Sequence, residues 1–319
     1  MSSLTDDAVP RDVASAGPVG MSAATDWAHR PAGEARLVAG LLHDWQQRNL
    51  AESLPIALRQ LEAAGNLDNV RLAIAGGANP GLSYRGPVFM DSDIYKTLEA
   101  IGWQLAQGSS PELAAFAAEV TALLERAQPP DGYLNSYFQV SAEPRYSRLS
   151  SSHEMYCAGH LIQAAVALRR GAGDGRLLAV ATRLADHLVR EFGGQARGLD
   201  GHPIIETALV ELYRETGNGD YLALATQFVD QRGSGLAGDS GMGRRYLQDH
   251  MPVRSSVTEV GHVVRALYLE AGVADVAAET GDRELLESSV RRWEDMVAAK
   301  TYLTGGNGSR HSDEGFGDR

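Results

Sequence analysis

The dipeptide Gly-His occurs at three places, each time at the head of an apolar run with helical periodicity. The pairs are Gly159-His160, Gly201-His202 and Gly261-His262, and their histidines are separated by 42 and then 60 residues. After each run come a glycine-containing polar break and a second amphipathic segment. Self-similarity on this scale is typical of stacked helix pairs, either an open solenoid or a closed toroid. We therefore predict an all-α fold of helical hairpins, in which each pair begins a helix and the histidines meet around one pocket.

The hairpin pattern starts well before the first Gly-His pair. Apolar periodicity and capping residues predict helices over 35–47, 49–64 with a break near Pro55, 94–106 and 111–127, whereas 131–138 is expected to be a turn followed by an extended segment. About eight or nine helices follow from this count. Residues 1–33 are rich in Ala, Ser, Gly, Pro and Asp without a sustained period, so we expect a mobile leader and a single domain over 34–319.

Charge and cysteine content limit the classes of ligand and the cellular compartment that the sequence favours. The chain has 29 basic and 41 acidic residues, a net charge of −12, which disfavours nucleic acid because such binding neutralises phosphates with Lys and Arg. The net negative charge favours a neutral, sugar-like or cationic ligand instead. Its one cysteine, Cys157, excludes an internal disulfide framework and is typical of a reducing compartment. Neither a signal-peptide core nor a membrane-length apolar stretch is present in the sequence. We expect a cytoplasmic protein without a membrane partner, and homo-oligomerisation stays open.

Histidines are the main candidates for a binding site. Imidazole both donates and accepts hydrogen bonds, so His153, His202 and His262 could hold sugar hydroxyls. For His160, a capping or packing role stays equally open. The residue four positions after His153 is Cys157 rather than a second histidine, so the segment does not match the zinc-protease pattern. Glu314, in the glycine-rich end of the chain, would by itself be interpreted as a solvated acidic residue.

Several long motifs, in order along the chain, resemble glycoside hydrolase family 127, the β-L-arabinofuranosidase family. They are DSDIYKTLEA at 91–100, DGYLNSYF at 131–138, HEMYCAGHL at 153–161, GH at 201–202, YLQDHMPV at 246–253, GHVVRA at 261–266 and LTGG at 303–306. The resemblance implies an (α/α)6 barrel whose pocket binds a terminal L-arabinofuranose. It also implies a zinc ion held by one glutamate and three cysteines, with a zinc-bound thiolate as nucleophile and a separate glutamate as acid/base.

Individual roles follow from the same resemblance. Glu314 matches the acid/base position, and His153, His202 and His262 match histidines that contact the sugar. The family's zinc ligands follow the acid/base glutamate, in a Glu-Thr-Cys segment and a Cys-Cys pair. Neither motif occurs up to Arg319, and Cys157 belongs to a different motif. The resemblance therefore implies that no metal ligands lie in this chain, that its barrel is incomplete at the C-terminus, and that the isolated chain does not turn over.

Two other functions remain open at this point. The chain could be a helical-toroid sugar epimerase or lyase that uses histidine acid/base catalysis without a metal, which predicts activity without zinc or a thiol. It could also be a noncatalytic sugar-binding or α-solenoid module. In an α-solenoid whose Gly-His pairs face outward, replacing His202 or His262 would affect only stability.

Overall fold

The protein is mainly helical in the part of the chain that the computed structural model describes, which is residues 19, 20, 22, 36–77, 79 and 81–318. The elements, in chain order, are α1 (Leu41–Arg48), the π-helix η1 (Asn49–Ser53), α2 (Leu54–Ala64), α3 (Asn66–Ile74), α4 (Asp91–Gln107), α5 (Pro111–Ala127), α6 (Ser136–Val140), α7 (Leu149–Ser152), α8 (Glu154–Ala172), α9 (Arg176–Phe192), α10 (Ile205–Thr216), α11 (Gly219–Gln231), the 3-10 helix η2 (Val253–Ser255), α12 (Val263–Thr280) and α13 (Arg283–Ala299). In these residues β-pairing is limited to isolated bridges. The all-α prediction is confirmed.

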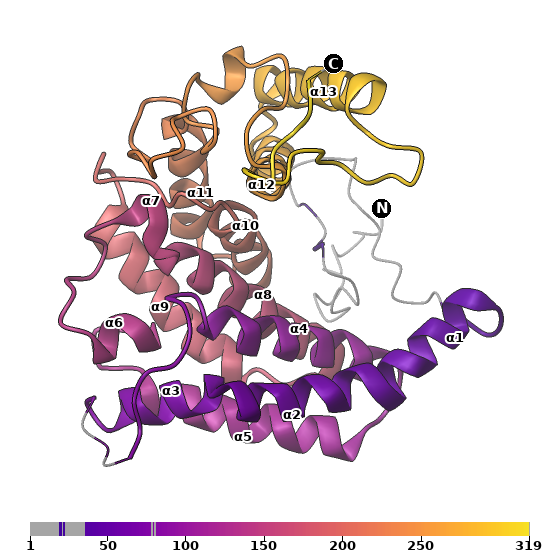
Figure 1. The fold of residues 1–319 in the computed structure, drawn as a ribbon, viewed down its shortest axis with the longest axis vertical. Coiled ribbons are helices and arrows are strands. Elements are labelled where there is room, and N and C mark those ends of the chain that lie inside the picture. Colours follow the sequence, from indigo (N-terminus) through magenta and orange to yellow (C-terminus); the bar gives the residue numbers. More distant parts are fainter. Residues whose placement is uncertain (1–18, 21, 23–35, 78, 80, 319) are drawn as a thin grey trace, which may run out of the picture.

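The helices form two rows along an arc. In the first row, α4 packs against α8, α8 against α10, and α10 against α12. In the second row, α5 packs against α9 and α9 against α11. In Figure 1 the arc runs from α1 and α2 at one end to α12 and α13 at the other. This succession of paired helices is the predicted toroid of hairpins, an architecture of the (α/α)6-barrel type.

Glycines end the helices of the first row where the sequence predicted breaks. Gly173, Gly217 and Gly281 follow α8, α10 and α12, with φ of 70°, 72° and 69°. A left-handed residue at this position lets its amide bond back to the last turn, and glycine adopts it without strain. The chain then reverses into the next helix.

The prediction that all three Gly-His pairs begin helices is wrong for the first pair. Gly159 and His160 lie within α8, which starts at Glu154. A Cβ on Gly159 would lie 2.9 Å from Cγ2 of Ile204 and 3.1 Å from its carbonyl carbon. This glycine is therefore needed because the start of α10 packs closely on α8. Gly201-His202 lies just before α10, and His262 is the N-cap of α12.

Two predicted boundaries also differ from the structure. Residues 136–140 form the short helix α6 rather than an extended segment, because the side chain of Asn135 accepts a hydrogen bond from the amide of Phe138 and caps it. No break occurs near Pro55: the helix that begins at Leu41 runs through η1 into α2. Proline lacks an N–H, and the wider π-turn just before it accommodates that missing donor.

Most of the predicted leader lies outside the described residues. Of its described part, Gly20 is buried and donates its backbone N–H to both carboxylate oxygens of Glu211 on α10, at 3.1 and 3.0 Å. Among the helices described, none is long and apolar enough to cross a membrane.

A buried ion network joins three helices of the first row. Arg214 on α10 pairs with Asp275 and Glu279 on α12, at 2.8 and 2.7 Å, and also with Glu211. Arg170 on α8 reaches the other oxygen of Glu211 at 2.7 Å. The arginine side chains are almost fully inaccessible, so each guanidinium depends on these carboxylates for its charge balance.

Candidate active site

The three histidines predicted to contact sugar lie side by side at the N-terminal ends of α8, α10 and α12. Ring centroids are 5.8 Å apart for His153 and His202, and 5.9 Å apart for His202 and His262. The ring of Tyr156, on the first turn of α8, packs on His202 at 4.4 Å. The first row of helices thus brings residues from three separate segments into one cluster.

Glu314 joins this cluster through His262. Its Oε2 lies 3.1 Å from Nε2 of His262, and its side chain is otherwise largely exposed. The backbone holds it there, because Val263 donates its amide to the Glu314 carbonyl at 3.0 Å and Phe316 donates to the Gly261 carbonyl at 3.0 Å. The residue is therefore anchored on the start of α12, whereas its sequence context alone suggested a solvated tail.

Backbone contacts determine which ring nitrogen of each histidine carries the proton. Nδ1 of His262 accepts hydrogen bonds from the amides of Val264 and Arg265, at 3.1 and 3.4 Å, so in the neutral ring the proton is on Nε2, which donates to Glu314. In His153 and His202 the pattern is reversed. Nδ1 of each lies 2.9–3.0 Å from a carbonyl oxygen, which only accepts, so Nδ1 donates and Nε2 is left as an acceptor.

Burial keeps these rings neutral. It lowers the pKa of His202 to about 2 and lowers the pKa of His153 below its usual value. For His262, burial and then the charge of Arg265 lower the pKa, and these outweigh the opposing effect of Glu314. The cluster therefore offers two neutral acceptor nitrogens and, at His262, a donor paired with a carboxylate. Such a set matches the hydroxyl groups of an uncharged ligand.

Asp200 fixes the histidines relative to one another. Its carboxylate accepts hydrogen bonds from the amides of Met155 and Tyr156 on the first turn of α8, at 2.9 and 3.2 Å, and from the amide of His202 at 2.8 Å. Burial raises its pKa to about 6 despite these three donors. Asp200 was not among the residues predicted from the sequence. Its signal was an acidic residue directly before a Gly-His pair, since free helix-start amides require an acceptor.

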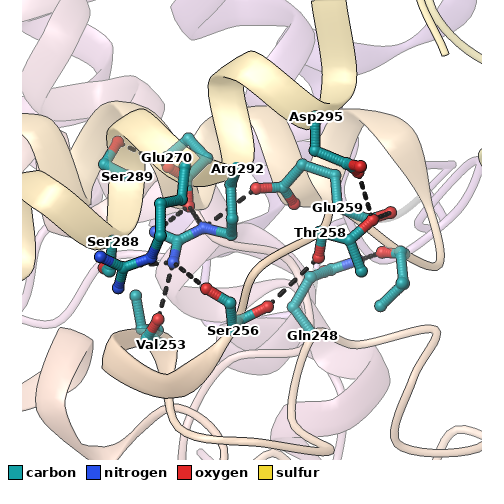
Figure 2. Close-up of polar contacts among 12 residues, drawn as sticks. Gln248, Val253, Ser256, Thr258, Glu259, Glu270, Ser288, Ser289, Arg292 and Asp295 are labelled. Carbon is teal, nitrogen blue, oxygen red and sulfur yellow. Dashed lines mark hydrogen bonds and ion pairs between the residues drawn. The ribbon is translucent and has the colours of Figure 1, made fainter. Parts of the chain in front are cut away.

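A second polar cluster supports the loop that carries His262. Arg292 on α13 pairs with Glu270 on α12 at 2.6 Å and with Glu259 at 3.2 Å, and it donates to the carbonyl of Val253 at 2.6 Å (Figure 2). Gln248 donates to the carbonyls of Val260 and His262, at 2.8 and 3.2 Å. The loop is thus tied on both sides of Gly261, whose φ of 75° and close approach to the Arg245 carbonyl exclude a side chain there.

His160 lies deeper in the protein than the other histidines. Only 3% of it is exposed, and it packs between Tyr156 and Tyr268 at centroid distances of 4.6 and 5.8 Å. Neither ring nitrogen has a hydrogen-bond partner among the described residues. The capping alternative for this residue is therefore wrong. Burial lowers its pKa to about 3.

This burial predicts a pH-dependent contribution to stability. An unfolded histidine has a pKa of about 6.5, so on acidification the unfolded state binds the proton first, and stability is lost as the pH falls from 6.5 towards 3. Between pH 7 and 5.5 the wild type should lose about 1.2 kcal/mol more unfolding free energy than His160→Leu. Urea unfolding of both proteins at the two pH values measures this, and parallel losses would contradict it.

The residues present do not fit a zinc–thiolate centre. Cys157 is 1% exposed, and burial raises its thiol pKa well above the usual value, which disfavours the thiolate that zinc would bind. Among the described residues, no group of three or more His, Cys, Asp or Glu side chains could hold a metal ion.

The comparisons with known proteins identify the family. The sequence profile described as β-L-arabinofuranosidase, GH127 catalytic domain, matches residues 34–319. The chain belongs to this family. A curated relative, the non-reducing end β-L-arabinofuranosidase of Bifidobacterium longum subsp. longum, is 39% identical over 292 residues. That alignment covers 84% of the chain and 42% of the relative.

Solved structures of the family agree with this assignment. The GH127 β-L-arabinofuranosidase from Geobacillus stearothermophilus T6 superposes with a TM-score of 0.83 at 38% identity, covering 88% of the chain and 48% of that protein. A GH127 β-arabinofuranosidase superposes with a TM-score of 0.83 at 31% identity, covering 95% of the chain and 47% of that protein. The chain thus spans less than half the length of these family members. Its family membership does not favour the epimerase, lyase or noncatalytic alternatives.

Proposed function

We propose that this chain supplies the sugar-binding side and the acid/base glutamate of a glycosidase that releases terminal L-arabinofuranose from β-linked glycosides. The observation that carries the proposal is the contact between Glu314 and His262, beside His153 and His202. It joins a carboxyl group to a set of neutral donors and acceptors, which is what cleavage of a sugar acetal requires.

The proposed mechanism assigns a task to each side chain. The Nε2 atoms of His153 and His202 accept hydrogen bonds from two hydroxyls of the sugar and so fix the orientation of its ring. The carboxyl group of Glu314 gives a proton to the leaving oxygen and then takes one from the attacking water. The N–H of His262 points at that carboxyl group and holds it toward the sugar between the two steps.

The metal, the cellular location and the partners of the protein are also proposals. The resemblance in sequence to family 127 supports a zinc ion in the active enzyme, held by residues other than those of the candidate site. We further propose a cytoplasmic location, because Cys157 is the only thiol in the sequence, and a small carbohydrate as the only partner. Assembly into a homo-oligomer remains open.

A hydrolysis assay tests the activity. The protein expressed from its complete natural gene is incubated with para-nitrophenyl β-L-arabinofuranoside. The α anomer of the same compound is the matched control. We expect nitrophenol release from the β anomer alone, and His202→Ala should raise KM about tenfold or more because a buried acceptor for the sugar is lost. No release, or equal release from both anomers, would refute the proposed activity.

A further inference from the structure

One buried arginine, Arg292 on α13, holds the segment that leads into α12. Its Nη1 donates to the carbonyls of Val253 and Ser256, at 2.6 and 3.4 Å, and its Nε lies 3.2 Å from Oε1 of Glu259. Only 2% of Arg292 is exposed. A single guanidinium therefore contacts residues 253–259, which we call the strap, at three points (Figure 2).

Two charged residues near the end of α13 hold the last part of the strap. The hydroxyl of Thr258 donates to Asp295 at 2.5 Å, and the ammonium group of Lys300 donates to that hydroxyl oxygen at 2.6 Å. Lys300 also donates to the backbone carbonyl of Glu259. Both the backbone and the side chains of the strap are thus fixed on α13.

The strap leads directly into the residues that hold Glu314. One residue separates it from Gly261, whose carbonyl accepts a hydrogen bond from the amide of Phe316 at 3.0 Å. Val263 donates to the Glu314 carbonyl at 3.0 Å, and Nε2 of His262 lies 3.1 Å from the Glu314 carboxylate. All three contacts start just beyond the strap, so the placement of the carboxyl group depends on where the strap is held.

Arg292 also balances the charge of two carboxyl groups. Glu259 belongs to the strap, and Glu270 on α12 lies 2.6 Å from Nη2 of the guanidinium. Burial and then the charge of Glu270 raise the pKa of Glu259 to about 8, although Arg292 opposes this. Near pH 7 Glu259 is therefore mostly protonated, and the guanidinium offsets the charge of Glu270. Loss of Arg292 would both release the strap and remove the cation beside a buried carboxylate.

We propose that Arg292 is a positioning residue for the acid/base glutamate. By fixing the strap it holds His262, and through His262 the carboxyl group of Glu314, in the orientation that proton transfer to the leaving oxygen requires. A displacement of about 1 Å caused by a remote substitution can cost about 10²-fold in rate. Arg292 thus contributes to kcat although it is itself buried, and the inference rests on the proposed role of Glu314.

NMR of the histidine ring nitrogens tests the positioning in the labelled 319-residue chain. Glu314→Ala first gives the His262 signals that mark loss of the carboxylate contact. We expect Arg292→Met to move the wild-type signals toward these, and Arg292→Lys to move them less because it keeps the charge. If Arg292→Met does not fold, the double variant with Glu270→Gln, which also removes the carboxylate charge beside the arginine, tests the same point. Unchanged His262 signals in the folded methionine variant would overturn the proposal.

Arg170→Met is the matched control. Arg170 is likewise buried and pairs with two carboxylates, those of Glu211 and Glu215, at 2.7 and 2.5 Å. It lies near the C-terminal end of α8, whereas the histidine cluster lies at the N-terminal end. The variant should lower stability because it leaves buried carboxylates without their cation, but it should not move the His262 signals. Equal movement in both variants would show general loosening of the fold and would also overturn the proposal.

Kinetics of the protein expressed from its complete natural gene give a second readout. On glycosides with poor leaving groups, Arg292→Met should lower kcat about ten- to hundredfold and change KM less than about twofold. Dinitrophenyl arabinofuranoside should be affected much less, and Arg292→Lys should restore part of the loss. Equal losses on both substrates would overturn the positioning role. A wild type that releases no sugar would refute the proposed function separately, because the NMR comparison does not depend on turnover.

Discussion

Replacing Arg214 by methionine should lower the free energy of unfolding by about 3–5 kcal/mol, because it leaves buried carboxylates without their cation. Among the described residues, Glu279 would lose its ion-pair partner, and Asp275 would keep its hydrogen bond from Thr207. Burial opposes the charge on Arg214, yet Asp275 and Glu211 raise its pKa above the usual value, so the network favours the charged form. Urea denaturation followed by circular dichroism measures the loss.

A surface pair provides the control for this prediction. Arg176→Met removes the ion pair with Asp174, in which the arginine is 60% exposed, and should cost less than about 1 kcal/mol. The double variant Arg214→Met with Glu279→Gln should regain part of the loss, because it removes one stranded charge. If Arg214→Met costs no more than Arg176→Met, the network does not stabilise the first row of helices.

Glu314→Gln should abolish most turnover on glycosides with poor leaving groups, by about 10²–10⁴-fold. The amide has the same shape and still accepts the His262 hydrogen bond, but it cannot donate a proton to the leaving oxygen. Dinitrophenyl arabinofuranoside needs little protonation, so its first step should slow much less. The ratio of kcat/KM on the two substrates, in the polypeptide expressed from its natural reading frame, is the quantity to measure.

The same segment offers a control for this variant. The side chain of Asp318 is 98% exposed and pairs with Arg310 at the surface, so Asp318→Asn should leave both rates within about twofold. Equal loss on both substrates in Glu314→Gln would remove the acid/base assignment and leave a role in binding or in holding the loop.

The sequence predicted the elements of this fold whose causes are local. Helices end at Gly173, Gly217 and Gly281 because a left-handed residue is needed there, and such positions can be predicted without tertiary information. The repeat of Gly-His pairs correctly placed His202 beside His262, but the third histidine beside them is His153, which is not part of the repeat, and not His160. One of the wrong predictions, the role of Gly159, depends on contact with Ile204, which lies 45 residues away in the sequence.

The chemistry of the candidate site depends on contacts that the spacing of residues in the sequence does not reveal. The proton positions on His153 and His202 follow from single carbonyl oxygens, and the support from Asp200 reaches amides 44 and 45 residues away. The neutral state of His160 likewise depends on its burial without a hydrogen-bond partner in the described part of the chain. Glu314 was assigned by resemblance, and only the bridge to α12 explains how a residue in a glycine-rich loop is held.

The N-cap of α12 has a consequence for how this site can vary. At His262 the hydrogen bonds that start the helix are also the ones that direct the opposite side of the ring toward Glu314. Asparagine or aspartate would cap the helix equally well but would be too short to reach that carboxyl group. The imidazole at position 262 therefore both caps α12 and hydrogen-bonds to Glu314. A substitution that preserves the cap would keep the fold intact but would still remove the contact with Glu314.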